Sequence, residues 1–248
     1  MKKKTYSSLE NALRILDLFT MEKSEYSIRE ISDQLGIAYS TAHRLVKNLE
    51  DEGFIVKDSI LNSYRLSVSI LSLSSVVTAH TKLISNSTYL LKKLSSQFKA
   101  TVQIGVMHRE HVYYINKTDY EHLIMGYVTY IERKVPLHYT SAGKILLSQL
   151  SEEEIINYSE QYLLTATAFS NIEDFLVELK HVKTNGYAIS ADEYYHDFIT
   201  VAAPLKNTSG HIIAAIELVY PNDAKLLRTI EQRAKEFKKV CEKIRLNS

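Results

Sequence analysis

Residues 27–53, SIREISDQLGIAYSTAHRLVKNLEDEG, contain the strongest structural signals in the N-terminal part of this 248-residue chain. Ser27 and Glu30 have the spacing of a capping box, in which two side chains satisfy backbone N–H groups at a helix start. Gly36 stands where a helix C-cap favours glycine, and a second helix follows almost at once and ends at Gly53. The stretch therefore predicts two helices joined by a tight turn.

The second of these helices has two chemically different sides. Its apolar residues recur at helical spacing and predict a buried side, made of Ala42, Leu45, Val46 and Leu49. The opposite side carries hydroxyl, imidazole, guanidinium and ammonium groups, with no acid before Glu50. Such a surface fits DNA, because hydroxyls and N–H groups at a helix start bind phosphate and Arg or Asn side chains read base edges. A merely solvated polar helix is the alternative interpretation.

A helix before this pair and a hairpin after it favour the DNA-binding interpretation. Ser7 and Glu10 form a further capping box, and the apolar face predicted behind it consists of Leu9, Ala12, Leu13, Leu16 and Phe19. Residues 54–56 and 64–66 read as strands joined by a polar turn, which completes the order of a winged helix-turn-helix. On the second helix and the wing we predict DNA contacts at Tyr39, Ser40, Thr41, His43, Arg44, Lys47, Asn62 and Arg65, with Lys57 and Tyr64 beside them on the wing.

Composition sets limits on this hypothesis. The net charge of +1 does not by itself indicate nucleic acid, and residues 1–66 hold ten Lys or Arg and ten Asp or Glu, so the argument rests on where the charges lie. A single cysteine, Cys241, excludes an internal disulfide and fits a reducing compartment. No stretch is apolar enough to span a bilayer, so we expect a cytoplasmic protein without a membrane partner.

The rest of the chain predicts a second, larger domain. Residues 70–84 form an apolar helical stripe that is too long for a bare linker; packing in a dimer and burial on its own domain both remain open. Helical and strand patterns then alternate, with strands expected at 102–106, 112–115, 123–130, 187–190, 199–205 and 211–219. The predicted fold is α+β: a winged helix-turn-helix at residues 1–67, a linker helix at 68–84 and an α/β domain at 85–248.

Three patterns that could carry other chemistry are weak. Gly143-Lys144 lacks the earlier glycine of a phosphate loop, and the turn at residues 108–111 offers two histidines without an obvious third metal ligand. Ser141, His138 and Asp192 supply the residue types of a hydrolase triad, but no nucleophile elbow accompanies them. We therefore expect no catalytic residues, no metal site and no cofactor.

Two sets of motifs resemble the isocitrate-lyase-regulator (IclR) family of transcription factors. The first set comprises NALRIL at 11–16, ISDQLG at 31–36 and STAHRLVKNL at 40–49. The second comprises PLHYTSAGK at 136–144, GYA at 186–188, Glu193, VAAP at 201–204 and AAI at 214–216. The two sets occur in the order and at the spacing typical of the family, and together they extend over almost the whole chain.

The resemblance implies a GAF-like effector-binding domain after the linker helix. It also implies a repressor that binds double-stranded operator DNA as a homodimer or tetramer and responds to a small-molecule effector. Family members commonly bind small organic acids, sugar acids or aromatic compounds. Carried over to this sequence, the implied effector pocket consists of Val135, Ser141, Ala142, Ser190, Thr200, Glu217 and Val219.

This chain departs from the family pattern inside that pocket. Thr200 replaces a common cysteine, Asp197 replaces an expected glycine, and Glu217 stands where small hydroxyl residues are common. A carboxylate in a pocket disfavours an anionic effector unless it is protonated or paired, so we expect a neutral polyol, a sugar or an amine. A ligand-binding enzyme with an appended helix-turn-helix, and a DNA-binding structural protein without an effector, are the alternative functions.

Overall fold

The computed structural model describes residues 6–20, 23–80, 82–120, 134–162, 171–191 and 198–246. The chain divides into two compact units, Met1–His80 and Thr81–Ser248, each with its own core. The predicted strand at residues 123–130 and three residues discussed above, Asp192, Glu193 and Asp197, lie outside the described residues. Within those residues, no helix combines the length and apolar character needed to cross a membrane.

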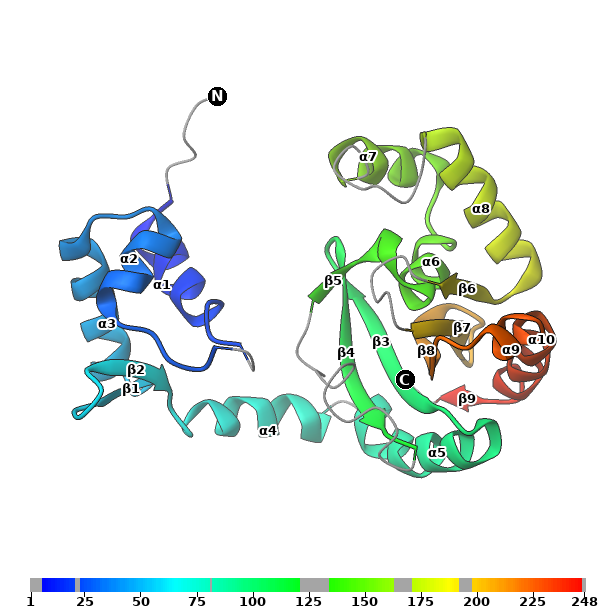
Figure 1. Cartoon of the computed structure of the whole chain (residues 1–248), viewed down its shortest axis with the longest axis horizontal. Coiled ribbons are helices and arrows are strands. Elements are labelled where there is room, and N and C mark those ends of the chain that lie inside the picture. The colour runs from blue at the N-terminus through cyan, green and yellow to red at the C-terminus, as the bar shows by residue number, and fades with distance from the viewer. Residues whose placement is uncertain are drawn as a thin grey trace. The chain divides into compact units, whose positions relative to one another are not determined.

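The N-terminal unit is a winged helix-turn-helix, as predicted (Figure 1). Both capping boxes form, at Ser7 with Glu10 and at Ser27 with Glu30. Gly36 has a φ of 63°, the left-handed conformation that lets the chain turn sharply between the two motif helices. The elements are α1 (Ser8–Leu16), α2 (Ile28–Leu35), α3 (Tyr39–Asp51), β1 (Ile55–Asp58), β2 (Ser63–Leu66) and α4 (Ile70–His80).

Two predictions for this unit are wrong in part. Of the predicted apolar face, Ala12, Leu16 and Phe19 pack against the core, but Leu9 and Leu13 are 70% and 55% exposed. Asn11 and Ile15 are buried instead, where α1 contacts α3. Tyr64 was expected to reach DNA from the wing, but β2 turns its ring into the core, where the side chain is buried.

The C-terminal unit is built on an antiparallel sheet with the strand order β5-β4-β3-β8-β7-β6, and β9 pairs with β7 in parallel. Its strands are β3 (Thr101–His108), β4 (His111–Thr118), β5 (Lys134–Pro136), β6 (Ala188–Ala191), β7 (Phe198–Asn207), β8 (Ile212–Pro221) and β9 (Arg245–Leu246). Its helices are α5 (Lys82–Phe98), the 3-10 turn η1 (Leu137–Tyr139), α6 (Ser141–Leu147), α7 (Glu152–Tyr162), α8 (Ile172–Asn185), α9 (Ala224–Leu227) and α10 (Ile230–Cys241).

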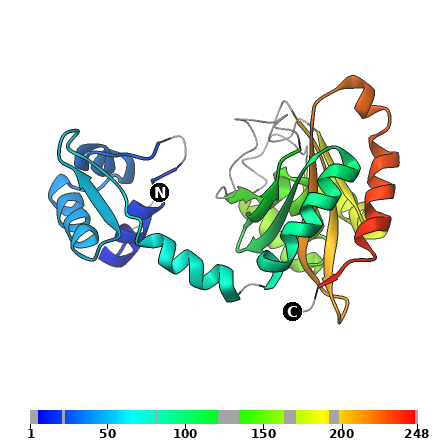
Figure 2. The same ribbon diagram turned by 90° about the horizontal axis from the view of Figure 1, so that it is seen from below.

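Helices cover both faces of this sheet (Figure 2). Helices α5 and α10 pack on one face, whose core includes Phe98, Ile216, Phe237 and the buried Cys241. Helices α6, α7 and α8 pack on the other face with a second apolar cluster. Because successive side chains of a strand point to opposite faces, Glu217 of β8 lies on the α6 side although its neighbours in sequence belong to the other core.

Candidate functional site

The outward side of α3 is accessible and polar. The four residues predicted to be buried, Ala42, Leu45, Val46 and Leu49, pack in the core of the N-terminal unit. Consequently the eight predicted DNA-contacting side chains all reach solvent: Thr41 is half-buried, and the exposed ones are Tyr39, Ser40, His43, Arg44, Lys47, Asn62 and Arg65.

The N-terminus of α3 is uncapped. Its N-cap residue is Ala38, which offers no side-chain hydrogen bond, and the first turn carries no acid. In contrast, α1 and α2 begin with serine–glutamate capping boxes. The first N–H groups of α3 have no intrahelical partner, and the positive end of the helix dipole lies there. This end of α3 is therefore suited to bind a phosphate group.

Two cations of this surface already have protein partners. The Arg44 guanidinium donates from Nη2 to Ser8 Oγ of α1 at 3.1 Å. Lys47 Nζ lies 2.9 Å from Asp51 Oδ1 and 3.2 Å from Glu50 Oε2, and the hydrogen bond that the lysine donates to Asp51 raises the pKa of the lysine. Such exposed pairs contribute little stability, so a phosphate can compete for the lysine. Glu50 and Asp51 follow Lys47 by three and four residues, a spacing at which opposite charges on a helix pair.

A cluster of buried polar side chains lies between α6 and the sheet of the C-terminal unit. Its centre is Glu217, which is 1% exposed. Oε1 accepts hydrogen bonds from Ser141 Oγ at 2.7 Å and from the backbone N–H of Ala142 at 3.1 Å. Oε2 accepts from Gln103 Nε2 at 2.6 Å and from the Tyr114 hydroxyl at 2.7 Å. Four donors fill the acceptor positions of both oxygens.

A row of hydroxyl groups continues from this cluster toward the edge of the sheet. Ser190, Thr200 and Val219 are aligned across β6, β7 and β8. Ser141 Oγ lies 2.9 Å from Thr200 Oγ1. Because the single Ser141 proton is used on the carboxylate, the Thr200 hydroxyl donates to Ser141 and keeps its own acceptor positions. Ser190 Oγ donates to the backbone carbonyl of Tyr139 at 3.3 Å.

The structure thus brings most of the implied effector residues together. Hydrogen bonds or strand register join Ser141, Ala142, Ser190, Thr200, Glu217 and Val219, and Val135 lies in the same apolar cluster as Ala142. Sequence reasoning missed Gln103, although a polar residue between Val102 and Ile104 in an apolar strand was a usable signal.

Local geometry holds α6 against the sheet. Thr140 caps the helix by accepting from the Gly143 N–H. A Cβ on Gly143 would lie 1.9 Å from the Leu137 carbonyl oxygen, so only glycine permits this approach. Lys144 is fully buried and pairs with Glu178 at 2.6 Å. Gly143-Lys144 is therefore the start of a packed helix, and the lysine points into the protein.

Ser141 and His138 have other hydrogen-bond partners than each other. His138 is buried, its Nδ1 lies 2.7 Å from the Tyr158 hydroxyl, and desolvation lowers its pKa to about 4. Ser141 instead contacts Thr200 and Glu217. The described part of the chain also contains no group of three or more His, Cys, Asp or Glu side chains placed to hold a metal ion.

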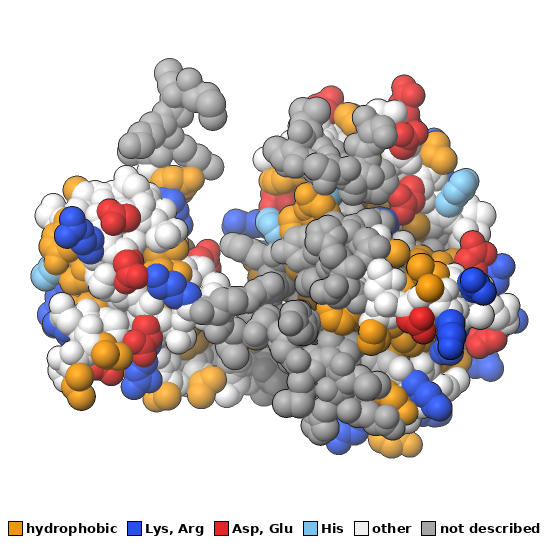
Figure 3. Space-filling view, viewed as in Figure 1, with side chains coloured by type: hydrophobic (Ala, Val, Ile, Leu, Met, Phe, Trp, Pro, Cys, Tyr) orange, Lys and Arg blue, Asp and Glu red, His pale blue; other side chains and the backbone are white. Residues whose placement is uncertain are grey.

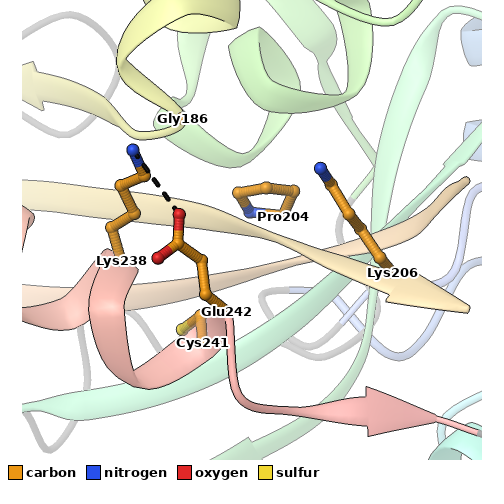
Figure 4. A pocket seen from close by; sticks show the side chains of 6 residues that line it. All are labelled: Gly186, Pro204, Lys206, Lys238, Cys241 and Glu242. Atoms are coloured by element: carbon orange, nitrogen blue, oxygen red, sulfur yellow. Dashed lines mark ion pairs between the residues drawn. The ribbon is translucent and has the colours of Figure 1, made fainter. Parts of the chain in front are cut away.

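A separate surface cavity of about 250 Å³ lies at the far end of β7. Its lining residues are Gly186, Pro204, Lys206, Lys238, Cys241 and Glu242 (Figure 4). Lys238 Nζ pairs with Glu242 Oε1 at 3.5 Å across its rim. The polar cluster around Glu217 contributes no residue to this cavity.

Two family models match this chain in sequence order. The helix-turn-helix domain of IclR matches residues 8–59, and the C-terminal domain of the bacterial transcriptional regulator IclR matches residues 75–245. The HTH-type transcriptional regulator XynR of Escherichia coli K12 is 29% identical over 85% of this chain and 84% of its own length. The HTH-type transcriptional regulator KdgR of the same organism is 24% identical over 93% of this chain and 88% of its own length.

Solved structures show the same fold. An IclR transcriptional regulator from Alicyclobacillus acidocaldarius superposes with a TM-score of 0.76 at 17% identity, covering 95% of this chain and 99% of that one. An IclR homologue from Microbacterium hydrocarbonoxydans, complexed with 4-hydroxybenzoate, gives 0.72 at 18% identity, with 94% and 98% coverage. The matched models, the relatives and the fold agree, and this chain belongs to the IclR family of transcriptional regulators.

Proposed function

We propose that this chain is a sequence-specific transcriptional repressor whose outward α3 side and wing bind operator DNA. The uncapped, acid-free start of α3, beside a row of accessible polar side chains, is the observation that carries the proposal. The direction of regulation follows the AllR transcriptional repressors of Salmonella, which are 23% identical over 86% of this chain. A p-hydroxybenzoate hydroxylase transcriptional activator is also a relative, so a reporter assay must test the sign.

A second copy of the chain completes the DNA-binding surface. The side chains of α4 at Leu71, Leu73, Val76 and Val77 are exposed, which argues against burial of this helix on its own unit. An α-helix that is apolar on several sides needs a partner, and a two-fold dimer buries the same helix of both copies. Such a dimer presents two α3 helices to successive major grooves.

Selection of DNA from a randomised pool by the purified full-length chain tests this function. We expect the bound sequences to share two inverted half-sites about one helical turn, roughly 34 Å, apart. Light scattering of the same sample should give at least twice the chain mass of 28.4 kDa. Recovery of unenriched sequences would refute specific DNA binding, and a monomer mass would refute the dimer.

The effector site that we propose comprises the residues around Glu217. Its carboxylate is buried among neutral donors, and the unused hydrogen-bonding capacity of Ser190 and Thr200 is that of acceptors. A ligand bound there must bring donors, and within the described residues it meets a carboxyl group whose four hydrogen-bond donors are all neutral. Neutral polyols, sugars and amines satisfy both conditions, whereas a carboxylate ligand does not.

Isothermal titration calorimetry of the full-length chain tests the effector class. We expect polyols, sugars or amines to include a binder, and we expect 4-hydroxybenzoate and small dicarboxylates to bind at least tenfold more weakly. Thr200→Val removes a hydroxyl with little change of volume and should lower the affinity for the ligand by about tenfold. Tight binding of a dicarboxylate would overturn this proposal.

A further inference from the structure

The tip of the wing hairpin is apolar and almost fully exposed. Ile60 and Leu61, between β1 and β2, are 91% and 65% exposed. Hydrophobic side chains stand out at the end of this hairpin in the space-filling view (Figure 3). Turn positions normally carry Gly, Asn, Asp, Pro or Ser, because these residues suit the turn backbone. Single exposed apolar residues are common, but an adjacent pair at a hairpin tip calls for a partner.

The backbone of the turn presents these two side chains in a fixed way. Asp58 Oδ1 accepts the N–H groups of Ile60 at 2.8 Å and of Leu61 at 3.0 Å. Asn62 then takes a left-handed conformation with a φ of 50° and returns the chain to β2. The aspartate is thus occupied by the turn itself, and the turn presents Ile60 and Leu61 to solvent between the exposed Ser59 and Asn62.

The chemistry around the tip indicates what covers it. Lys57 of β1 and Arg65 of β2 are exposed on the strands behind the tip, and Asn62 is exposed beside it. A surface in which two apolar side chains lie next to cations suits a polyanion that has an apolar groove between its charged groups. Two side chains supply only a small part of the roughly 800 Å² per partner that a stable protein interface needs. The hairpin also packs against α3 through β1. Binding of α3 to DNA would therefore place the tip close to the same duplex.

We propose that Ile60 and Leu61 enter the minor groove next to the α3 contact and pack against sugars and base edges. This proposal rests on the DNA-binding function proposed above. Apolar side chains pushed into a minor groove favour base steps that bend or unstack easily, such as TA and CA steps. The wing would therefore read the deformability of the flanking sequence, while α3 reads base edges in the major groove.

The test uses the full-length chain and the duplex selected by the wild type. We expect the double variant Ile60→Ser/Leu61→Ser to lose between tenfold and hundredfold in affinity, because buried hydrocarbon contact disappears. The slope of log K against log salt should stay unchanged, since no phosphate contact is lost. Energy transfer between dyes at the duplex ends should report a smaller bend. Val177→Ser, which removes an exposed apolar side chain from α8, is the matched control and should change none of these readouts.

Each other outcome is decisive. If the double variant binds and bends the duplex like the wild type, while Arg44→Ala weakens binding, the minor-groove proposal fails and DNA binding by α3 stands. If the wild type selects no sequence, the proposed function itself fails. A change of mass in the double variant without DNA would assign the tip to a second copy of the chain and overturn the proposal. A lower salt slope with an unchanged bend would overturn it as well.

Discussion

Arg44→Ala is expected to abolish specific operator binding and to leave the fold intact. The guanidinium is exposed on the outward side of α3, where it donates a hydrogen bond to Ser8 of α1. A bidentate arginine–guanine contact contributes about 1–3 kcal/mol of discrimination, and a two-fold dimer loses it at both half-sites. We therefore expect at least a hundredfold loss for the selected duplex and a much smaller loss for unrelated DNA.

A gel-shift titration with both duplexes measures this effect. Arg228→Ala removes the same charge from an exposed position after α9 and serves as the control. Its affinity for the selected duplex should match that of the wild type. Unchanged operator affinity of the Arg44 variant would show that α3 does not read the operator through this side chain.

Glu217→Leu is expected to lower the free energy of unfolding of the C-terminal unit by about 3–5 kcal/mol. Leucine leaves four buried donors without their acceptor: the Gln103 amide, the Tyr114 and Ser141 hydroxyls and the Ala142 N–H. These donors come from β3, β4 and α6, so the substitution also loosens α6 from the sheet.

Urea unfolding followed by circular dichroism measures this loss. Glu217→Gln keeps the shape and one acceptor oxygen, so its loss should be clearly smaller than that of the leucine variant. A leucine variant as stable as the wild type would show that the cluster does not hold α6 to the sheet. In that case the carboxylate would contribute to ligand binding and not to stability.

Local patterns in the sequence were sufficient for much of the fold. The capping boxes at Ser7 and Ser27 form as predicted, and Gly36 adopts the left-handed conformation that ends α2. The buried side of α3 also appears where its apolar spacing placed it. These features depend on residues within about four positions of one another, so their physical causes are contained in a short window of sequence.

Contacts between residues far apart in the sequence could not be predicted from such local patterns. The apolar spacing of α1 correctly placed Ala12 and Leu16 against the core, but packing against α3 buried Ile15 and left Leu9 and Leu13 exposed. Likewise, a wing tyrosine expected to face DNA, Tyr64, turned out to be in the core. In both cases the local spacing was satisfied by more than one orientation, and packing against another element made the choice.

Local signals in the sequence were enough to establish a winged helix-turn-helix with a polar outward α3, because helix caps, turns and amphipathic spacing are local. The family motifs added a prediction of which residues line a second site. The folded structure was needed to show that the Glu217 carboxylate accepts hydrogen bonds from Gln103, Tyr114, Ser141 and Ala142. Those partners come from three different elements, between 75 and 114 positions away in the chain, and only the packing of α6 on the sheet brings them within hydrogen-bonding distance.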